Sequence, residues 1–252
     1  MELIVLGAGP AYSDLPGATG AAYLLYDRGT WLLLDLGQGS FPALAGRVEP
    51  STLAGVVVSH LHPDHFIDLV PLRHYLRYEF DPPRRGRVHG PSGLMDRLDA
   101  LHDEPGFTSA ALDVVDLAPG TRTIGPFEVE AAFVRHTAES YAFRVGTAAG
   151  PGLVYSGDCG RADDLRPLIR PGDTLLSEVS FGPGPVPPGA EHLDGPAVGR
   201  LATATGVARL LLTHLQMGFS PEATVASARR SFAGPVELVA PGFTTALRTA
   251  ET

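Results

Sequence analysis

Ser59-His60-Leu61-His62-Pro63-Asp64-His65 is the segment from which the architecture and the chemistry of this chain can be inferred. Four side chains that can bind a metal ion lie within six residues here, directly after a run over Val56–Ser59 that predicts a β-strand. Imidazole and carboxylate groups are good ligands for zinc and similar ions. His60 and His62 are two residues apart, so an extended backbone places both on the same side, and the Asp64-His65 pair can turn toward a second position. A surface loop would rarely gather three of the nine histidines in six residues, so the segment predicts a metal site.

Short apolar runs separated by Gly, Pro and Asp lie on both sides of this segment. Their patterns predict strands over Leu3–Leu6, Ala21–Tyr26, Trp31–Asp35, Phe127–Val134, Tyr141–Val145, Leu153–Ser156, Thr174–Ser177, Arg209–Thr213 and Val236–Val239. Helical spacing predicts helices over Asp68–Tyr78, Pro196–Thr205 and Glu222–Phe232. Strand-rich stretches in both halves, with helices between and after them, predict an α/β fold in which two sheets pack face to face with helices outside. No linker or short repeat divides residues 1–252, so one domain is expected.

The composition is that of a folded protein that does not grip long nucleic acids. Hydrophobic residues make up 44% of the 252 residues and charged residues 19%, which excludes a disordered chain. The net charge is −9, whereas proteins that clamp long nucleic acids usually carry a basic face. Cys159 is the single cysteine, so no disulfide forms within the chain. The N-terminal residues lack the pattern of a signal peptide, and no segment is long and apolar enough to span a membrane, so a cytoplasmic location without membrane contact is expected.

The histidine segment resembles the H-x-H-x-D-H signature of the metallo-β-lactamase-fold hydrolases. The resemblance extends along most of the chain, in the order that the family has and with each motif at the end of a predicted strand. Its further motifs are Leu6-Gly7-Ala8-Gly9-Pro10, Leu34-Asp35-Leu36-Gly37, Phe133-Val134-Arg135-His136, Ser156-Gly157-Asp158 and Leu212-Thr213-His214. The resemblance implies an αββα sandwich of two mixed sheets with outer helices.

The resemblance also implies a centre of two divalent metal ions. By that resemblance His60, His62 and His136 bind one ion, Asp64, His65 and His214 bind the other, and Asp158 bridges them. Taken alone, His136 or His214 would be an ordinary histidine and Asp158 a turn residue, so their assignment depends on the whole set. Zn²⁺ is the expected metal, and Mn²⁺ and Fe²⁺ are also compatible with these ligands.

Three features narrow the branch of the family. Two complete ligand sets argue against the single-iron dioxygenases. Asp158 stands where many true β-lactamases have a cysteine, and the neighbouring Cys159 is interpreted as a structural thiol. The chain is too short for the large inserted domain of the nucleases that process messenger RNA.

Two later segments resemble the branch that contains the tRNA 3′-processing enzymes, ribonuclease Z, and related phosphodiesterases. They are Ser177-Glu178-Val179-Ser180-Phe181 and Glu191-His192-Leu193-Asp194. The resemblance implies that His192 donates a proton or hydrogen bond near the leaving group, that Glu178 orients it, and that the ligand Asp64 also takes part in catalysis. The alternative is that His192 only caps the helix that begins near Pro196.

The expected activity is that of a small-substrate enzyme. The loop over residues 181–189 is short and uncharged, and no long basic arm is present, so the chain is more similar to the small bacterial enzymes that cleave cyclic nucleotides. The resemblance implies attack of a metal-held hydroxide on a small anionic phosphodiester, with cyclic AMP the leading substrate. Alternatives are a tRNA 3′-end endonuclease, a lactone, thioester or aryl sulfate hydrolase, and, least favoured, a metal-binding sensor without activity. A homodimer is common among such enzymes.

Residues around the substrate are less well defined by the sequence. The arginine cluster between residues 73 and 87 is interpreted either as a phosphate contact or as a solvated helix end and loop. It comprises Arg73, Arg77, Arg84, Arg85 and Arg87. Pocket residues are expected from loops near Tyr12, Phe80, Phe107 and Met217.

Overall fold

The computed structural model describes residues 1–15, 17–147 and 150–247 and contains two seven-stranded sheets. The first sheet has the spatial order β14 (Thr244–Ala246), β1 (Glu2–Gly7), β2 (Ala22–Asp27), β3 (Thr30–Leu34), β4 (Leu53–Val57), β5 (Gly86–Gly90) and β6 (Leu112–Asp116). The second has the order β13 (Val236–Leu238), β12 (Arg209–Thr213), β11 (Thr174–Glu178), β10 (Leu153–Tyr155), β9 (Tyr141–Gly146), β8 (Phe127–Phe133) and β7 (Gly120–Ile124).

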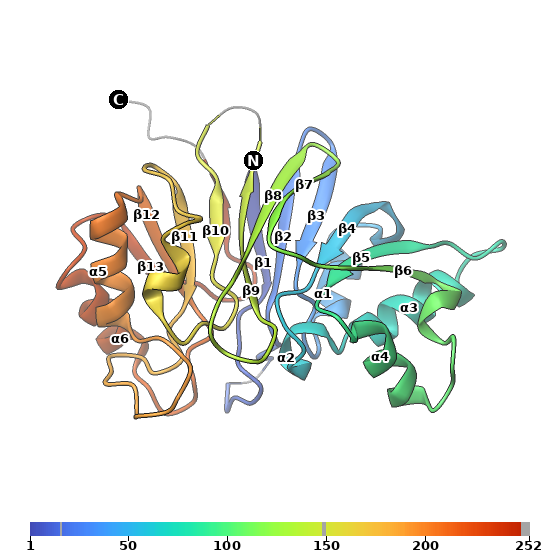
Figure 1. Cartoon of the computed structure of the whole chain (residues 1–252), viewed down its shortest axis with the longest axis horizontal. Helices are drawn as coiled ribbons and strands as arrows, with labels where there is room; N and C mark the ends of the chain where they lie inside the picture. The colour runs from blue at the N-terminus through green and yellow to red at the C-terminus, as the bar shows by residue number, and fades with distance from the viewer. Residues whose placement is uncertain (16, 148–149, 248–252) are drawn as a thin grey trace.

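Both sheets are mixed, and helices lie outside them. Antiparallel pairs join β14, β1, β2 and β3, and parallel pairs join β3 to β6. In the second sheet, β10 to β13 are parallel and β7 to β10 antiparallel. The helices are α1 (Phe41–Arg47), α2 (Pro63–Phe66), α3 (Leu69–Tyr78), α4 (Leu94–His102), α5 (Gly195–Thr205) and α6 (Pro221–Arg229). Figure 1 shows α5 and α6 beside the second sheet and α3 and α4 beside the first, so the predicted α/β sandwich with two mixed sheets is confirmed.

Burial explains why the strands read as continuous apolar runs. Leu32 and Leu34 of β3 point into the core between the sheets, and Leu33 points into the core beneath the outer helices, where it joins Leu72 of α3. All four side chains are at most 2% exposed. A strand covered on both faces has no polar alternation, and for that reason its sequence is apolar at successive positions.

The strand ends that carry the predicted site lie on one side of the sandwich. In Figure 1, α2 lies at the lower ends of the central strands, between the two groups of outer helices. Pro63 begins α2 directly after His62, a position where proline's missing N–H costs nothing. Gly37 is required because a Cβ there would lie 1.9 Å from the carbonyl oxygen of Asp64. The Asp-x-Gly motif therefore lets the first sheet approach the backbone of the metal segment.

Several predicted boundaries are wrong by a few residues. The strand predicted over Val56–Ser59 begins earlier, at Leu53, and ends at Val57, because the backbone of Ser59 turns to donate to Asp35 instead of a neighbouring strand. The last helix ends at Arg229 rather than at Phe232. Among the α-helices and strands of the described residues, the sequence analysis also missed α1, α2, α4, β5, β6, β7 and β14.

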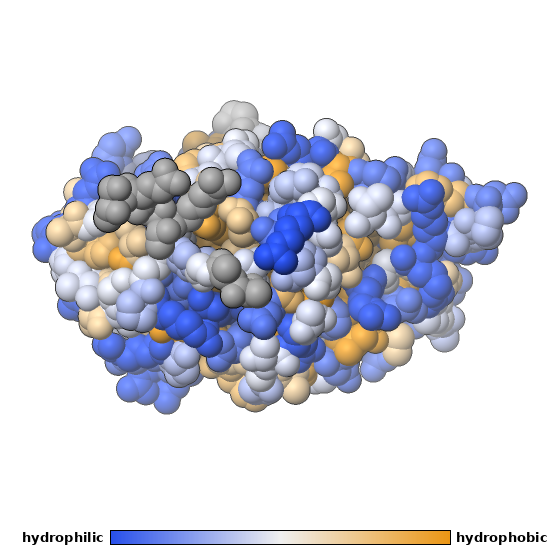
Figure 2. Space-filling view, turned by 90° about the horizontal axis from the view of Figure 1, so that it is seen from above, coloured by the Kyte–Doolittle hydropathy of each residue, from blue (hydrophilic) through white to orange (hydrophobic). Residues whose placement is uncertain are grey.

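Among the described residues, no helix combines the length and the apolar character that a membrane crossing requires. Figure 2 views the molecule from above, on the face away from α2, and shows mostly hydrophilic residues with hydrophobic ones in small groups.

An ion pair away from the site fastens the second sheet, and its removal has a predictable pH dependence. The buried carboxylate of Asp173 accepts two 2.8 Å hydrogen bonds from Arg144 and one from the backbone N–H of Gly152. Burial opposes its charge, but these donors outweigh burial and lower the pKa of Asp173. Because the folded-state pKa is lowered, the stabilisation is present above the unfolded-state value and is lost as the pH falls through the folded-state value.

We therefore expect Asp173→Asn to lower the free energy of unfolding at pH 7 by about 3 kcal/mol. The difference from the wild type should shrink as the pH falls through the lowered pKa of Asp173, below which the wild-type carboxyl is also protonated. Urea unfolding at pH 7 and over a series of acidic pH values measures it. The control is Asp163→Asn, because Asp163 pairs with Arg166 at the exposed surface and its loss should change stability by less than about 0.5 kcal/mol. Equal losses for the two variants at pH 7 would contradict the prediction.

Candidate metal centre

The seven predicted ligands come together from both sheets. Their donor atoms form two groups, each with all atoms within 4.8 Å of one another. The first group is His60, His62, His136 and Asp158, and the second is Asp64, His65, Asp158 and His214. The segment after β4 provides four of these residues, and the ends of β8, β10 and β12 provide the other three. Asp158 belongs to both groups, as the resemblance implied for a bridging ligand.

Three of the candidate ligand histidines are oriented by a hydrogen bond on the outer nitrogen. His65 Nδ1 donates to Asp35 at 2.7 Å, and His136 Nδ1 donates to the carbonyl oxygen of Glu191 at 2.8 Å. His214 Nδ1 lies 3.1 Å from the hydroxyl of Ser180. In all three rings Nε2 is left to face the centre of the site. This arrangement is typical of metal-ligating histidines, whose second nitrogen fixes the tautomer and the ring orientation.

The inner nitrogens meet one another where a shared cation would satisfy them. His65 Nε2 lies 3.3 Å from His214 Nε2, and His136 Nε2 lies 3.0 Å from His62 Nδ1. Two imidazole lone pairs at such distances repel unless a proton or a metal ion lies between them. Nε2 of His60 is also buried and has no hydrogen-bond partner among the described residues. Such an orphaned atom in a polar site fits a metal ligand.

The buried carboxylates around the centre also require nearby positive charge. Asp35, Asp64, Asp158 and Glu178 are between 0% and 4% exposed. In the described part of the chain, these four pair only with histidines and with no arginine. Buried charges are normally paired or coordinate metals. Two divalent cations would balance four carboxylates and leave the imidazoles neutral, so the residues fit the two-metal centre that the sequence predicts.

The titration behaviour of the side chains fits this charge distribution. Burial, together with the neighbouring histidines, holds the pKa of His60 and His62 below the ordinary value. Both rings are therefore neutral and have a lone pair that can bind a metal ion. Burial also opposes the charged form of His65, but Asp158 and Asp35 outweigh it and raise the pKa of His65. For Asp158, burial is outweighed by His214 and His65, so its pKa lies well below the ordinary value. The centre therefore keeps its carboxylates ionised and attracts cations.

Glu178 and His192 form a hydrogen-bonded pair beside Asp158. The Glu178 carboxylate accepts hydrogen bonds from the backbone N–H of Cys159 at 2.8 Å and of Ser180 at 3.0 Å. It also accepts a 3.0 Å hydrogen bond from His192 Nδ1. Burial disfavours the imidazolium, but Glu178 and Asp158 outweigh it and raise the pKa of His192. Cations bound next to Asp158 would act in the opposite direction.

The alternative role for His192, as a helix cap, is wrong. The N-cap of α5 is Asp194, whose carboxylate accepts a 2.9 Å hydrogen bond from the backbone N–H of Ala197. His192 is thus free of that task. Cys159 is buried, and its thiol donates to the carbonyl oxygen of Arg161 at 3.2 Å, outside both ligand groups.

Sequence reasoning gave no role to Ser180. The Ser180 hydroxyl donates to Glu178 at 2.5 Å and lies within 3.2 Å of Nδ1 of both His192 and His214. It therefore connects the orienting carboxylate with a metal ligand. The two-residue spacing from Glu178 to Ser180 after a strand was the available signal, because extended residues two apart face the same side.

Asp35 organises the centre to a degree that its motif did not reveal. Its carboxylate accepts hydrogen bonds from the hydroxyl of Ser59 at 2.8 Å, from His65 at 2.7 Å and from the hydroxyl of Tyr155 at 2.7 Å. Asp35 and the ligand His214 both have left-handed backbone conformations, with φ of 57° and 58°. Such strained backbone is costly for residues other than glycine and concentrates at functional sites.

We expect Asp35→Asn to weaken metal binding by about 10- to 100-fold, because the amide no longer fixes the tautomer of His65. Competition with a chromogenic chelator measures the affinity of the purified variant. Asp27→Asn is the matched control, because Asp27 ends β2 of the same sheet and pairs with the N-terminus and Arg28 rather than with the centre. Wild-type affinity in the Asp35 variant would show that the carboxylate has no orienting role.

A cavity of about 270 Å³ opens over the centre. Its lining residues are Pro10, Ala11, Tyr12, His62, Pro63, Asp64, Asp158, His192, His214 and Gln216. Of the four loops proposed to line the pocket, only the one near Tyr12 contributes its named residue to this cavity. Phe80 packs instead against Tyr75, and Phe107 stacks on His102.

The predicted arginine cluster is engaged elsewhere in the structure. Arg73 is 3% exposed, and its Nε donates to the carbonyl oxygen of Phe107 at 2.7 Å. Arg84 stacks over Phe80, and Arg85 pairs with Asp113. None of the cluster's arginines lines the cavity. The structure therefore favours the interpretation of a structural and solvated cluster over that of a phosphate contact.

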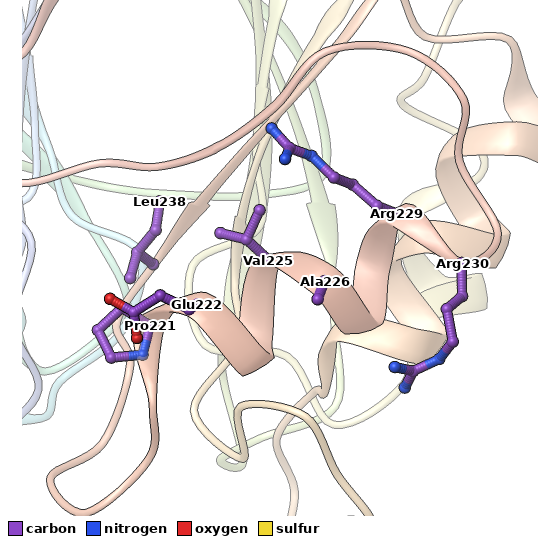
Figure 3. A pocket seen from close by; sticks show the side chains of 7 residues that line it. All are labelled: Pro221, Glu222, Val225, Ala226, Arg229, Arg230 and Leu238. Atoms are coloured by element: carbon purple, nitrogen blue, oxygen red, sulfur yellow. The ribbon is translucent and has the colours of Figure 1, made fainter.

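A larger hollow lies on the outer side of α6. It has a volume of about 650 Å³ and is lined by Pro221, Glu222, Val225, Ala226, Arg229, Arg230 and Leu238. Figure 3 shows its side chains, with Val225 of α6 and Leu238 of β13 facing each other. The hollow contains no histidine and shares no residue with the cavity over the ligand clusters. Reactive sites combine a cavity with perturbed titratable groups. In the smaller cavity Asp158 and His214 are buried and have shifted pKa values, whereas Glu222 of the larger hollow is exposed.

Comparisons with known proteins agree with this geometry. The chain is 35% identical to protein ML1173 of Mycobacterium leprae over 236 residues, which cover 91% of this chain and 83% of that protein. It is 27% identical to the probable metallo-hydrolase YhfI of Bacillus subtilis, over 96% of this chain and 98% of YhfI. A ribonuclease Z of Salinispora arenicola is 27% identical, over 92% of each chain.

Solved structures show the same fold. The crystal structure of YhfI from Bacillus subtilis, a metallo-beta-lactamase fold protein, matches with a TM-score of 0.86 and 25% identity, over 97% of this chain and 99% of that one. A diphosphatase from the PhnP family matches with a TM-score of 0.75 over 97% of each chain, and its 15% identity limits that likeness to the fold.

The family follows from a match that covers most of the chain. The family model described as the beta-lactamase superfamily domain matches residues 30–215, which include all seven predicted ligands. The sequence motifs, the two mixed sheets and the two clusters of histidine and aspartate agree with that match. The chain belongs to the beta-lactamase superfamily and is a metallo-hydrolase.

Proposed function

We propose that this metallo-hydrolase is a phosphodiesterase that cleaves small nucleotide phosphodiesters such as cyclic AMP. The observation that carries the proposal is the Glu178–His192 pair, whose imidazole lines the same cavity as the ligand clusters. Cleavage of a nucleotide phosphodiester releases a sugar alkoxide, which is a poor leaving group and gains from a proton in the transition state. The thiolate of a thioester and the phenolate of an aryl sulfate leave without that help, so a fixed proton donor favours a substrate that releases an alkoxide, such as the phosphodiester.

In the proposed reaction, one residue of the chain donates a proton and others hold the histidine rings in position. Glu178 holds His192 by Nδ1, so the imidazolium can present the proton on Nε2 to a leaving oxygen in the cavity. Against the effect of burial, the hydrogen bond to Glu178 raises the pKa of His192 and so favours the protonated ring that can donate. Asp35 and Ser180 hold the rings of His65 and His214 in place. When bound, two divalent ions, proposed to be Zn²⁺ with Mn²⁺ or Fe²⁺ as alternatives, supply Lewis acidity and an activated water.

The volume of the cavity, the uncharged loop beside it and the net charge of the chain support a small substrate. Sites for drug-sized molecules have volumes of about 300–1,000 Å³, and this cavity, at about 270 Å³, lies just below that range. The loop over residues 181–190 that precedes His192 carries no charged side chain, and the net charge of the chain is −9. Both properties disfavour a grip on a large RNA.

Two alternative activities remain to be compared with this one. The likeness to a ribonuclease Z supports cleavage at a tRNA 3′ end, and the same centre suits hydrolysis of lactones, thioesters or aryl sulfates. The likeness to a ribonuclease Z, which is named for cleavage of RNA, supports the phosphodiester over the carbonyl substrates.

The test is turnover by the purified full chain, loaded in turn with Zn²⁺ and Mn²⁺, on a panel of substrates. The panel contains cyclic AMP, a tRNA precursor, a lactone, a thioester and an aryl sulfate. We expect release of AMP that a chelator abolishes and that returns when the metal is restored. Faster turnover of the tRNA precursor or of a carbonyl ester, measured as kcat/KM, would replace the proposed substrate class.

A further inference from the structure

The cavity over the metal centre is lined on one part by candidate ligands and on another by residues outside the ligand groups. A phosphate held at the candidate ligands and His192 leaves the rest of the substrate to contact the other lining residues. Two groups border it without belonging to the clusters, the Pro10–Tyr12 loop and Gln216. The nucleobase of a bound substrate has to lie against this border or in the solvent.

Tyr12 offers the base a flat apolar surface. Its side chain is 66% exposed, although it borders a cavity. The loop beneath it is tied down, because the amide of Gln38 donates to the carbonyl oxygens of Pro10 at 3.1 Å and of Ala11 at 3.4 Å. The same loop is joined to the metal centre, since the backbone N–H of His214 donates to the carbonyl oxygen of Ala8. These hydrogen bonds hold the backbone of the loop beside the candidate ligands, and the loop presents the exposed ring of Tyr12 at the cavity.

Gln216 offers polar groups at the same border. Its backbone N–H bonds to the carbonyl oxygen of Ser180, two residues after Glu178, and this contact fixes its distance from the proton donor. In the described part of the chain, the side-chain amide of Gln216 has no hydrogen-bond partner. A glutamine amide can bond to the amino group and the ring nitrogen of adenine at once, as it does in protein–DNA recognition.

We infer that Tyr12 and Gln216 form a nucleobase subsite, in which the tyrosine ring stacks on the base and the glutamine amide hydrogen-bonds to its edge. The inference rests on the proposed phosphodiesterase function and specifies its substrate class as phosphodiesters with a base, adenine above all. Stacking tolerates every base because each has a π face. The preference for adenine comes from Gln216.

The subsite predicts a loss that depends on the base. We expect Tyr12→Ala to raise KM for cyclic AMP by about 5- to 100-fold, the loss typical of a stacked base, with kcat changed by less than about twofold. The same variant should hydrolyse the abasic analogue, ribose 3′,5′-cyclic phosphate, as the wild type does. Tyr12→Phe keeps the ring and should keep the wild-type KM. Leu15→Ala is the matched control, because Leu15 is 69% exposed in the same loop but does not line the cavity.

Gln216 is tested in the same assay. Gln216→Leu should raise KM for cyclic AMP by about 5- to 10-fold, as expected for lost hydrogen bonds, and leave the abasic analogue unaffected. Equal losses on both substrates, for either variant, would overturn the subsite, because they would point to damage of the centre rather than to loss of base contacts. An unchanged KM for cyclic AMP in Tyr12→Ala would overturn it as well.

Failure of the proposed function gives a different result. In that case the wild type, shown to hold two metals, hydrolyses neither cyclic AMP nor the abasic analogue. Equilibrium dialysis of AMP against the metal-loaded wild type and Tyr12→Ala then decides about the subsite. A loss of AMP affinity of about 5- to 100-fold in the variant supports base binding, and equal affinities overturn it.

Discussion

Asp158→Ala is expected to lower kcat/KM by at least about 10³-fold and to remove one or both metal ions. Asp158 is the one residue shared by the two ligand groups, and it is 2% exposed. It also lies within 3.3–3.9 Å of His60, His65, His136, His192 and His214. Metal ions supply several kcal/mol of transition-state stabilisation, and about 4 kcal/mol corresponds to 10³ in rate.

The measurement combines metal content by elemental analysis with turnover on the substrate that the wild type prefers. Asp96→Ala is the matched control, because Asp96 is an exposed aspartate of α4 outside both ligand groups. That variant should keep two metals and full activity. Two tightly held metals together with wild-type turnover in Asp158→Ala would rule out Asp158 as a bridging ligand.

His192→Ala is expected to lower kcat by about 10²- to 10⁴-fold while both metals stay bound. The loss should depend on the leaving group, because a proton donor matters most where the departing oxygen is basic. Turnover of cyclic AMP, which releases an alkoxide, should fall by the full factor. Turnover of a 4-nitrophenyl phosphodiester, which releases a stable phenolate, should fall much less.

Glu178→Gln provides the pH signature of the same pair. Glu178 raises the pKa of His192, so its neutral replacement should lower that pKa. A proton donor is active below its pKa, and the alkaline limb of the kcat profile should therefore move to lower pH in the variant. His102→Ala is the control for both variants and should keep the wild-type kcat profile, since His102 stacks on Phe107 and does not line the cavity.

The leaving-group comparison has its own contrary outcome. If His192→Ala lowered the turnover of cyclic AMP and of the 4-nitrophenyl phosphodiester equally, His192 would have a structural role instead.

The sequence was informative wherever a strand is buried on both faces and ends in the site. The prediction over Arg209–Thr213 agrees with β12 at both ends, because four of its residues are buried and polar His214 follows directly. The seven ligands could be named for a similar reason, since metal-binding side chains at strand ends are few and closely spaced.

The missed elements lack those local signals. Strand β7 (Gly120–Ile124) has one fully buried residue, and β5 (Gly86–Gly90) includes an arginine, a histidine and two glycines. Helix α1 contains Pro42 and Gly46 and buries only Leu44. Tertiary packing rather than pattern or propensity places these elements. The role of Asp35 was hidden for a related reason, because its partners His65 and Tyr155 come from segments that are distant in the sequence. For Ser180, the contact with His214 was hidden in the same way.

Both ligand groups contain residues from the two sheets, and this gives the metal a role in folding. The first group joins His60 and His62, which follow β4, to His136 and Asp158, which follow β8 and β10. The second group also draws on each sheet. Neither group exists until the sheets have docked, so cations that bind there select the docked state and stabilise it by about 4 kcal/mol at 1,000 times Kd. Because this linkage is reciprocal, a substitution that weakens the docking of the two sheets also weakens metal binding. The metal affinity therefore depends on the packing between the sheets as well as on the ligands.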